Sequence, residues 1–206
     1  MVTLWGRLSS INVRKAVWAA QEVGVPFTRI DAGGAFGIVR TPEFLRLNPN
    51  GLVPVLQDGD TVLWESNVIV RYLATRFPQH ALMPQDTPAR FQAEQWMDWQ
   101  QCTLNPAGRD AFIQWIRTPP GERRADLLQR SVTATEPLMA LLNQHLADRT
   151  HVLGDQFSVA DIPLACEVHR WFGLPQAHPS WPHLERWYSG LCQRPGSRGI
   201  LDQALS

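Results

Sequence analysis

The sequence predicts a small mixed α/β unit followed by a purely helical half. A strand pattern, a helical pattern and a second strand pattern succeed one another within about thirty residues, and a hairpin leading into a helix follows, which gives the order βαβ-ββα. From Pro78 onward no strand pattern appears, so the rest of the chain is expected to be helical. We therefore predict an α/β domain over residues 1–78, a linker over 79–87 and an all-α domain over 88–206.

The βαβ unit begins at the N-terminus. Val2–Trp5 has the residue types of a strand, and apolar residues spaced by three and four predict a helix over Asn12–Val23. Either Ser10 or Asn12 is placed to cap that helix, and Gly24 is placed to end it. Phe27–Ile30 then returns as a strand, which should run parallel to the first because a crossover helix joins them.

The second half of this domain is a hairpin and a helix. Thr41 and the proline after it predict a short helix over Pro42–Leu47. A strand around Val53–Leu56, a type I′ turn at Asp58-Gly59 and a return strand over Thr61–Trp64 form the hairpin. Apolar spacing then predicts a helix that begins at Glu65-Ser66 and reaches Phe77.

Two features of this hairpin suggest a ligand. Pro54 cannot donate to a ladder, so the backbone of Val53 beside it is available to another chain, and the bond between them is a candidate for the cis isomer. Ser66 lies at a helix N-terminus, where backbone amides and the helix dipole favour a carboxylate. The alternative is an ordinary connecting hairpin with a serine cap.

The helical half is divided by prolines and caps. Thr87-Pro88 is expected to start a long helix, which Pro106 and Gly108 should kink or break. Ser158 and Asp161 form a capping box, with Phe157 and Ile162 placed as its hydrophobic staple. A kink is expected at Pro137. The predicted helical segments are 87–104, 112–116, 127–146, 158–171, 181–191 and 197–205.

Composition excludes several classes of protein. The 206 residues carry 19 basic and 19 acidic side chains, and a formal charge of zero argues against nucleic-acid binding. The sequence contains no run of about 18 apolar residues, so we expect no membrane span, and the N-terminus lacks the pattern of a signal peptide. Three widely spaced cysteines form no metal-binding pattern, so we expect no metal and a cytoplasmic location.

Five stretches of this chain resemble the glutathione S-transferases, and most closely the bacterial theta-like members. The resemblance covers the whole chain and implies a thioredoxin-like domain that binds glutathione, an all-helical domain and a homodimer. It also implies an enzyme that activates the thiol of glutathione, its co-substrate, for attack on small electrophiles by halide displacement or conjugate addition. A glutathione-dependent disulfide or peroxide reductase and a non-catalytic interaction module are the alternatives. The stretches are LWGRLSSINVRK, FGIVRTPEFLRLNPNGLVPVL, LWESNVIVRYLA, WMDW and FSVADI.

The resemblance implies that a serine in the loop after the first strand activates the thiol. Ser10 is the residue we expect to donate to the sulfur, and the amide of Asn12 is a second candidate donor. Ser9 is the alternative, and a purely structural cap is the other role open to Ser10. The loop holds neither cysteine nor tyrosine, which disfavours chemistry through a mixed disulfide with the protein.

The resemblance also assigns the ends of the tripeptide. Val53 should pair through its backbone with the cysteinyl part, next to a cis bond at Pro54. Glu65 should face the ammonium and Ser66 the carboxylate of the γ-glutamyl end. Arg40 is a candidate for the glycine carboxylate, or else a solvated charge.

The second substrate is expected between the two domains. Arg7, Phe112, Trp115 and Trp171 are candidate walls of its pocket, although each aromatic residue also suits the core. The cation of Arg7, close to the expected position of the sulfur, suggests a small anionic electrophile such as a haloacid. Asp98 is a candidate contact for the glutathione of a partner subunit, or a local ion-pair partner.

Overall fold

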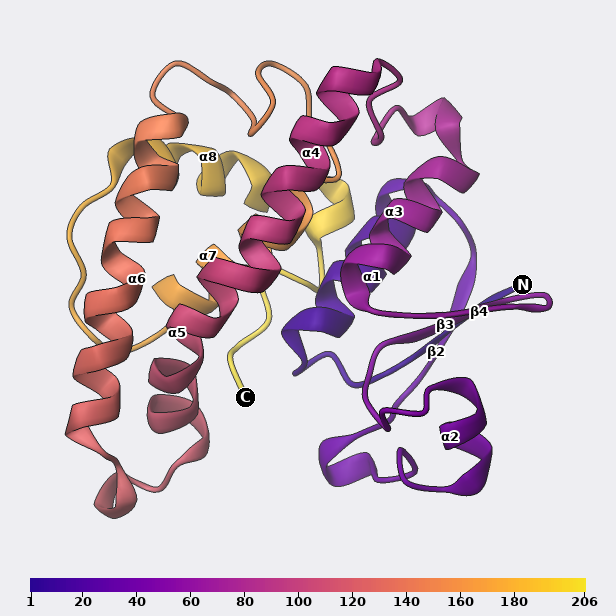
Figure 1. The fold of residues 1–206 in the computed structure, drawn as a ribbon, viewed down its shortest axis with the longest axis horizontal. Coiled ribbons are helices and arrows are strands. Elements are labelled where there is room, and N and C mark those ends of the chain that lie inside the picture. Colours follow the sequence, from indigo (N-terminus) through magenta and orange to yellow (C-terminus); the bar gives the residue numbers. More distant parts are fainter.

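The computed structural model describes residues 1–206 as a sheet-containing half and a helical half that lie side by side (Figure 1). The predicted fold class is confirmed. The sheet-containing half comprises β1 (Val2–Trp5), α1 (Ile11–Glu22), β2 (Phe27–Ile30), η1 (Gly34–Phe36), α2 (Pro42–Leu47), β3 (Val55–Asp58), β4 (Thr61–Trp64) and α3 (Ser66–Arg76). The helical half comprises η2 (Pro78–His80), α4 (Thr87–Trp99), η3 (Gln100–Leu104), α5 (Asn105–Phe112), η4 (Ile113–Arg117), η5 (Pro120–Glu122), α6 (Ala125–His145), α7 (Asp161–Phe172), α8 (Pro182–Cys192) and η6 (Pro195–Ser197).

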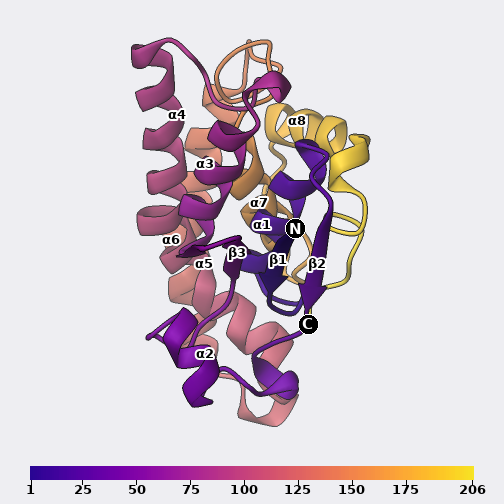
Figure 2. The same ribbon diagram turned by 90° about the vertical axis from the view of Figure 1, so that its right-hand side faces the viewer.

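The four strands form one mixed sheet in the order β2-β1-β3-β4. Strand β1 is parallel to β2, as predicted from the crossover, and antiparallel to β3. Side chains alternate between the two faces: Leu4 and Leu56 belong to the core shared with α1 and α3, whereas Trp5 and Val55 pack with Phe44 of α2. Figure 2 shows α1 and α3 on one side of the strands and α2 on the other.

The hairpin turn lies one residue later than predicted. Asp58 pairs with Thr61 in the ladder, so the two loop residues are Gly59 and Asp60. Gly59 has φ +59° and Asp60 has no positive φ, which excludes the predicted type I′ turn and matches a glycine in the first central position of type II′. The carboxylate of Asp58 accepts a hydrogen bond from the hydroxyl of Tyr72 at 2.9 Å, which helps to hold it in the strand.

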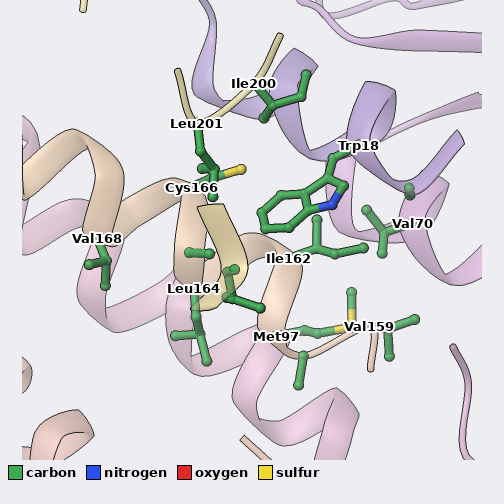
Figure 3. Close-up of a cluster of buried hydrophobic side chains, with 14 of the residues drawn as sticks. Trp18, Val70, Met97, Val159, Ile162, Leu164, Cys166, Val168, Ile200 and Leu201 are labelled. Carbon is green, nitrogen blue, oxygen red and sulfur yellow. The ribbon is translucent and has the colours of Figure 1, made fainter. Parts of the chain in front are cut away.

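A single apolar core joins the two halves. Trp18 of α1 is fully buried and lies among Val70 of α3, Ile162 of α7 and Leu201 of the C-terminal segment (Figure 3). Its neighbours thus come from the sheet-containing half and from the helical half. Since burying a large apolar side chain stabilises by about 1.5–3 kcal/mol, this contact couples the folding of one half to the other.

The long helix after the linker differs from its prediction at both ends. Asp86 rather than Thr87 caps it, because the Asp86 carboxylate accepts the Ala89 N–H at 3.0 Å. Pro106 does not interrupt the helix: Leu104, just before α5, keeps helical φ and ψ of −72° and −45°. The preceding η3 segment is a π-helix, whose backbone hydrogen bonds span five residues rather than four. Where the bonding returns to the α-helical pattern, one backbone N–H has no carbonyl to bind. Pro106, which has no N–H, therefore fits in the first turn of α5 without loss of a hydrogen bond.

The remaining helices are mostly where the sequence predicts them. Helix α6 continues through Pro137. In the capping box the Asp161 carboxylate accepts the Ser158 N–H at 2.9 Å as predicted, but the Ser158 hydroxyl accepts from Ala160 N–H rather than from that of Asp161. No helix is both long enough and apolar enough to cross a bilayer.

The predicted C-terminal helix over 197–205 is wrong. Only a short turn, η6, forms there, and Gly199 with φ +74° leaves the helical region. The guanidinium of Arg14 donates hydrogen bonds to the carbonyls of Ile200, Gln203 and Ala204 at 2.8–3.3 Å. The segment is therefore held against α1 as a strap of consecutive turns and irregular chain.

A buried polar chain also links the halves. The ammonium of Lys15, a fully buried residue of α1, donates to the side-chain oxygens of Gln100 at 2.8 Å and Gln101 at 3.1 Å. Gln100 in turn donates to Glu167 at 2.8 Å, and Glu167 is paired with Arg170. Burial lowers the pKa of Lys15 to about 8, against the opposing attraction of Glu167.

This buried lysine predicts a pH dependence of stability. Lysine in the unfolded chain titrates near 10.5, so between about pH 8 and pH 10.5 the unfolded chain binds more protons than the folded protein, and the free energy of unfolding contributed by Lys15 should rise with pH. At 1.36 kcal/mol for each pH unit the rise is on the order of 3 kcal/mol. Urea unfolding of the wild type and of Lys15→Met should therefore diverge above pH 8. Stability curves that stay parallel to pH 10.5 would contradict a neutralised lysine.

Candidate functional site

A cavity of about 360 Å³ opens between the two halves. Its walls are the loop from β1 to α1, the residues before β3, the helical run α5–η4, one side of α7 and the last residues of the chain. Figure 1 shows the C-terminus ending between the halves, and Leu205 and Ser206 at that end line the cavity. The structure brings six of the sequence-predicted site residues together in the lining: Arg7, Ser9, Ser10, Asn12, Val53 and Phe112.

The Ser10 hydroxyl has no partner in the protein. Ser10 occupies the N-cap position of α1, but its side chain makes no capping hydrogen bond, and only its backbone groups are used, toward Arg7 and Arg14. A serine N-cap ordinarily accepts an amide N–H of the first turn. The hydroxyl is thus left available at the cavity wall, beside the amide groups that begin α1.

Asn12 ties this loop to the start of α3. Its side-chain oxygen accepts a hydrogen bond from the Ser66 hydroxyl at 3.2 Å, and Ser66 is buried. The two residues are 54 positions apart, and their contact sets the N-termini of α1 and α3 next to each other. Both helix ends carry partial positive charge, so this corner of the molecule favours an anion.

Glu65 precedes α3 in an unusual backbone conformation. It has φ +70° and ψ 112°, and its exposed side chain makes no ion pair. A residue with a side chain in this region costs on the order of 1–3 kcal/mol, and such residues cluster at sites that hold ligands. The conformation orients the first amides of α3.

The Val53 backbone is also unused. Neither its N–H nor its carbonyl forms a hydrogen bond within the protein, because β3 begins only at Val55. The peptide bond from Val53 to Pro54 is cis. Gly6 makes room for this arrangement, since a Cβ at its position, with φ +146°, would lie 2.4 Å from the side chain of Val13 and 3.1 Å from that of Val53. The site therefore has an open peptide edge next to the serine loop.

Four of the predicted glutathione-site residues lie outside the cavity lining. Ser66 is hydrogen-bonded to Asn12, Pro54 is buried next to Val53, and Glu65 is exposed before α3. Arg40 is exposed, and its guanidinium donates to the carbonyl of Asn50 at 3.3 Å, over Gly51. Asp98, the candidate contact with a partner subunit, is paired with Arg71 of its own chain, the local role that its sequence position also allowed.

Phe112, one of the residues predicted for the second-substrate pocket, lies on the cavity wall that α5 forms. Two guanidinium groups contact the Phe112 ring, with Arg117 4.9 Å and Arg170 5.4 Å from its centroid. The two tryptophans predicted with it do not line the cavity. Trp171 is buried in the core, and the indole N–H of Trp115 donates to the side chain of Gln176 at 2.9 Å.

The cavity is strongly basic. Five arginines line it and no aspartate or glutamate side chain does; they are Arg7, Arg14, Arg109, Arg117 and Arg170. Burial lowers the pKa of Arg117, and the like charges of Arg7, Arg170 and Arg109 lower it further. The arrangement favours an anionic occupant.

Several residues that line the cavity were not predicted from the sequence. Asn105 and Arg109 lie on the same face of α5 as Phe112, at helical spacings of four and three. The predicted position of Phe112 at the pocket, combined with helical periodicity, therefore points to both. His169 of α7 gave no such signal. Its Nε2–H donates to the carbonyl of Gln203 at 2.9 Å, so its Nδ1 accepts from the hydroxyl of Tyr188 at 2.7 Å, and this neutral form agrees with a pKa that burial lowers.

Cys166 is the one cysteine in the lining. It is buried, and burial raises the pKa of its thiol to about 12. A thiol with so high a pKa stays protonated at neutral pH and is a poor nucleophile. The cavity therefore offers hydroxyl, amide and guanidinium donors rather than a reactive thiolate.

Comparison with known proteins agrees with this geometry. The family models described as "Glutathione S-transferase, N-terminal domain" and "Glutathione S-transferase, C-terminal domain" match residues 1–75 and 99–195. The chain is 41% identical over 203 residues to the glutathione S-transferase GstB of Escherichia coli strain K12, with 98% of each chain covered. The theta class glutathione S-transferase of Xanthomonas axonopodis pv. citri, solved with glutathione bound, superposes with a TM-score of 0.96 at 44% identity, covering 100% of this chain and 99% of that one. A glutathione transferase of Burkholderia graminis, solved with two glutathione molecules per subunit, superposes with a TM-score of 0.87 at 27% identity, covering 98% and 88%.

The chain belongs to the glutathione S-transferase family. It is a glutathione transferase, an enzyme for which glutathione is the co-substrate.

The contact between Asn12 and Ser66 predicts a measurable coupling. An intramolecular hydrogen bond contributes about 0.5–1.5 kcal/mol to stability, so a double-mutant cycle of Asn12→Ala and Ser66→Ala should give a coupling of about 1 kcal/mol in urea unfolding without ligand. Thr28→Ala, an exposed change on β2, serves as the uncoupled control against Asn12→Ala. Strictly additive losses for Asn12 and Ser66 would show that the two helix ends are not joined in this way.

Proposed function

We propose that Ser10 donates a hydrogen bond to the sulfur of glutathione and so stabilises the thiolate for attack on a small electrophile in the cavity. The observation that carries this proposal is the unpartnered Ser10 hydroxyl at the N-terminus of α1, on the cavity wall. The electrophile is attacked at carbon and the S–C bond forms: either a halide leaves with its electron pair, or an activated double bond opens and its other carbon takes a proton from water. The thiol proton is released to water when the thiolate forms.

The energy required is within reach of these groups. An ordinary thiol has a pKa of about 8.5 and is only a few per cent ionised at pH 7. Lowering that pKa by about two units needs roughly 2.7 kcal/mol of preferential stabilisation of the anion. One hydrogen bond to the thiolate contributes about 1.5–3 kcal/mol, and the end of a twelve-residue helix adds about 0.3–1 kcal/mol. The Asn12 amide nitrogen, which has no partner in the protein, is a second donor in this proposal.

The same proposal positions the tripeptide. The unused N–H and carbonyl of Val53 support backbone pairing with the cysteinyl residue, as in strand addition at an open edge. Glu65 would pair with the ammonium of the γ-glutamyl end, while Ser66 and the first amides of α3 would bind its carboxylate. Arg40, exposed beside Asn50, would reach the glycine carboxylate.

We also propose a cytoplasmic homodimer. All three cysteines are unpaired, which suits a reducing compartment. Val68 of α3 and Phe91 of α4 are 41% and 63% exposed, and apolar surface of this kind suits an interface with a second copy.

A second candidate function is the reduction of small disulfides by two molecules of glutathione. One observation favours it: the basic cavity could hold a second glutathione, an anion, next to the first, and the Burkholderia graminis transferase was solved with two glutathione molecules per subunit. Retention on immobilised glutathione, followed by turnover of an aryl halide, a haloacid and a small disulfide, separates the possibilities. Turnover of the disulfide alone would favour the reductase, and no retention would favour an interaction module.

The direct test of the proposal is Ser10→Ala. Loss of the donor should raise the pKa of the bound glutathione thiol by about one unit or more, measured from the ultraviolet absorbance of the thiolate, and should lower kcat/KM for an aryl halide about tenfold or more. The matched control is Ser9→Ala, which removes a hydroxyl from the same loop and the same cavity wall. An unchanged titration in Ser10→Ala would overturn the assignment, and a shift seen only in Ser9→Ala would transfer the role to Ser9.

Glu65→Gln tests the pose of the tripeptide. Removing the charge that would pair with the ammonium should weaken glutathione binding about tenfold, with kcat at saturating glutathione nearly unchanged. Isothermal titration calorimetry measures the Kd directly. Glu122→Gln, in the exposed η5 turn, is the charge-matched control. An unaltered Kd in Glu65→Gln would remove Glu65 from the site.

A further inference from the structure

We propose that Lys15 is a positioning residue for the transferase reaction. Through a chain of buried hydrogen bonds it sets the rotation of helix α5 about its own axis, and α5 carries the wall that faces the electrophile. Lys15 does not line the cavity, so it acts only through other residues. The inference rests on the proposed function, because it takes the electrophile to bind between Ser10 and α5.

Lys15 differs chemically from every other basic residue of the protein. It is the only lysine among the 19 basic side chains, and it is fully buried. Its ammonium donates to two consecutive residues, Gln100 at 2.8 Å and Gln101 at 3.1 Å. A compact ammonium can bind two separate oxygens, whereas the planar fork of a guanidinium suits a single carboxylate. The lysine therefore fits a site that joins two glutamines.

The two glutamines begin η3, the π-helical turn that connects α4 to α5. Consecutive side chains on a helix point about 100° apart, so the binding of both to one ammonium fixes the rotation of this turn. A π-helical turn holds one residue more than the α-helical bonding would, and such turns are common at functional sites. Loss of the π-helical bonding would rotate all that follows by about one residue, or about 100°.

The rotation of η3 decides which face of α5 lines the cavity. Asn105, Arg109 and Phe112 form that face. A rotation of about 100° would turn these three side chains away from the cavity and bring their sequence neighbours toward it. The composition of the wall therefore depends on the turn that Lys15 holds.

The hydrogen-bonded chain also fixes the far end of η3. The side-chain amide of Gln100 donates to the carboxylate of Glu167 at 2.8 Å. Glu167 is paired with Arg170, whose guanidinium donates to the side-chain oxygen of Asn105 at 2.9 Å. Asn105 is the first residue of α5. The chain thus runs from α1 through η3 and α7 to α5, and holds the π-helical turn at both ends.

The composition of this chain favours a role in selecting one arrangement. Buried charged groups seldom stabilise a protein more than apolar side chains of the same size would. Their best-attested use is to select one register among several that apolar packing alone would allow. Here the alternatives are the π-helical and the α-helical form of η3.

Lys15 connects this register to the site of thiol activation. It lies five residues after Ser10 in the same helix, so the chain holds α5 at a fixed place relative to the Ser10 loop. Reacting atoms must lie about 3–3.5 Å apart and be aligned, and a displacement of about 1 Å can cost about a hundredfold in rate. A shift of the α5 wall would therefore slow the reaction without altering how glutathione is bound.

Gln100→Leu tests the inference, because it removes the acceptor from η3 and leaves α1 intact. At saturating glutathione, kcat/KM for an aryl halide should fall about tenfold or more. The Kd for glutathione should stay within about twofold, and the bound thiol should titrate within about 0.3 pH unit of the wild type. Lys15→Met should give the same loss in kcat/KM, and the double variant should lose no more than either single variant, since both break one chain.

Two further variants serve as controls. Gln144→Leu makes the same substitution at an exposed position of α6. Leu184→Ala truncates a buried side chain of α8 and lowers stability without touching the chain or the cavity. Both should retain kcat/KM for the halide at a temperature at which they are folded. A loss in Leu184→Ala as large as that in Gln100→Leu would show that activity follows stability, and would overturn the positioning role.

A spectroscopic measurement tests the chain independently of activity. Since the protein has one lysine, labelling with ¹³C at the lysine ε carbon should give a single side-chain resonance. The ionisable groups that face Lys15 are Glu167, Cys166 and Arg170 of α7 and Glu65 before α3. Burial lowers the pKa of Lys15 to about 8, so the resonance should titrate near that pH, and Gln100→Leu should lower the midpoint because it removes a hydrogen bond to the charged form. A midpoint near 10.5, or one that Gln100→Leu leaves unchanged, would overturn the chain.

The outcomes separate failure of this inference from failure of the proposed function. An active wild type whose kcat/KM survives Gln100→Leu and Lys15→Met would overturn the positioning role and leave the transferase role intact. Equal losses in glutathione affinity and in kcat/KM would also overturn it, since Lys15 would then support the glutathione site rather than the α5 wall. A wild type that does not accelerate the halide and shows no thiolate absorbance with glutathione would overturn the proposed function itself.

Discussion

Helix α1 is the element on which both the fold and the site depend. The stretch Val13–Ala20 is buried on every side, between the sheet and α7. Trp18 packs into a core shared by the two halves, and Lys15 and Arg14 bind polar groups of the helical half. A helix held in this way cannot move without disturbing both halves, so its N-terminus is a rigid platform for the Ser10 loop.

The charged side chains are distributed unevenly between the cavity, which lies at the N-terminus of α1, and the rest of the protein. The chain as a whole is neutral, yet every ionisable side chain in the cavity lining whose charge is fixed at neutral pH is an arginine. Acidic side chains are found instead in ion pairs behind the wall, as Glu167 is with Arg170, or at exposed positions such as Glu65. The segregation concentrates positive potential where an anionic sulfur is proposed to form, and a neutral net charge gives no hint of it.

The sequence predicted the elements whose signals are local. Strand β1, the α1 stop at Gly24 and the parallel pairing of β1 with β2 follow from residue types, helical spacing and the crossover rule. The turn at Gly59-Asp60 and the cap at Asp86 differ by one residue from prediction, because two adjacent polar residues can each fill such positions. The helix expected over 197–205 failed for a different reason: Gly199 has φ +74°, and a distant residue, Arg14, binds the carbonyls of Ile200, Gln203 and Ala204 and holds the segment in another conformation.

The candidate site likewise contains residues that local sequence signals predict and residues that only the packing of the two halves brings together. Residues next to one another in sequence, such as Ser9 and Ser10 or Val53 and Pro54, were predictable from loop and strand chemistry and from the family resemblance. Helical spacing relates Arg109 to Phe112, but the meeting of Arg109 and Arg117 with Arg7 was not predictable, because only the packing of the helical half against the β1–α1 loop brings the three to one cavity. Trp171 illustrates the converse, since its helix faces the cavity through other residues while its own side chain is buried.

A crystal structure of the protein with glutathione tests the central claim most directly. We expect the sulfur to lie within hydrogen-bonding distance of the Ser10 hydroxyl, while the cysteinyl backbone of the tripeptide pairs with the N–H and carbonyl of Val53. A sulfur directed away from both serine hydroxyls of the loop, or a tripeptide bound elsewhere than along Val53, would contradict it.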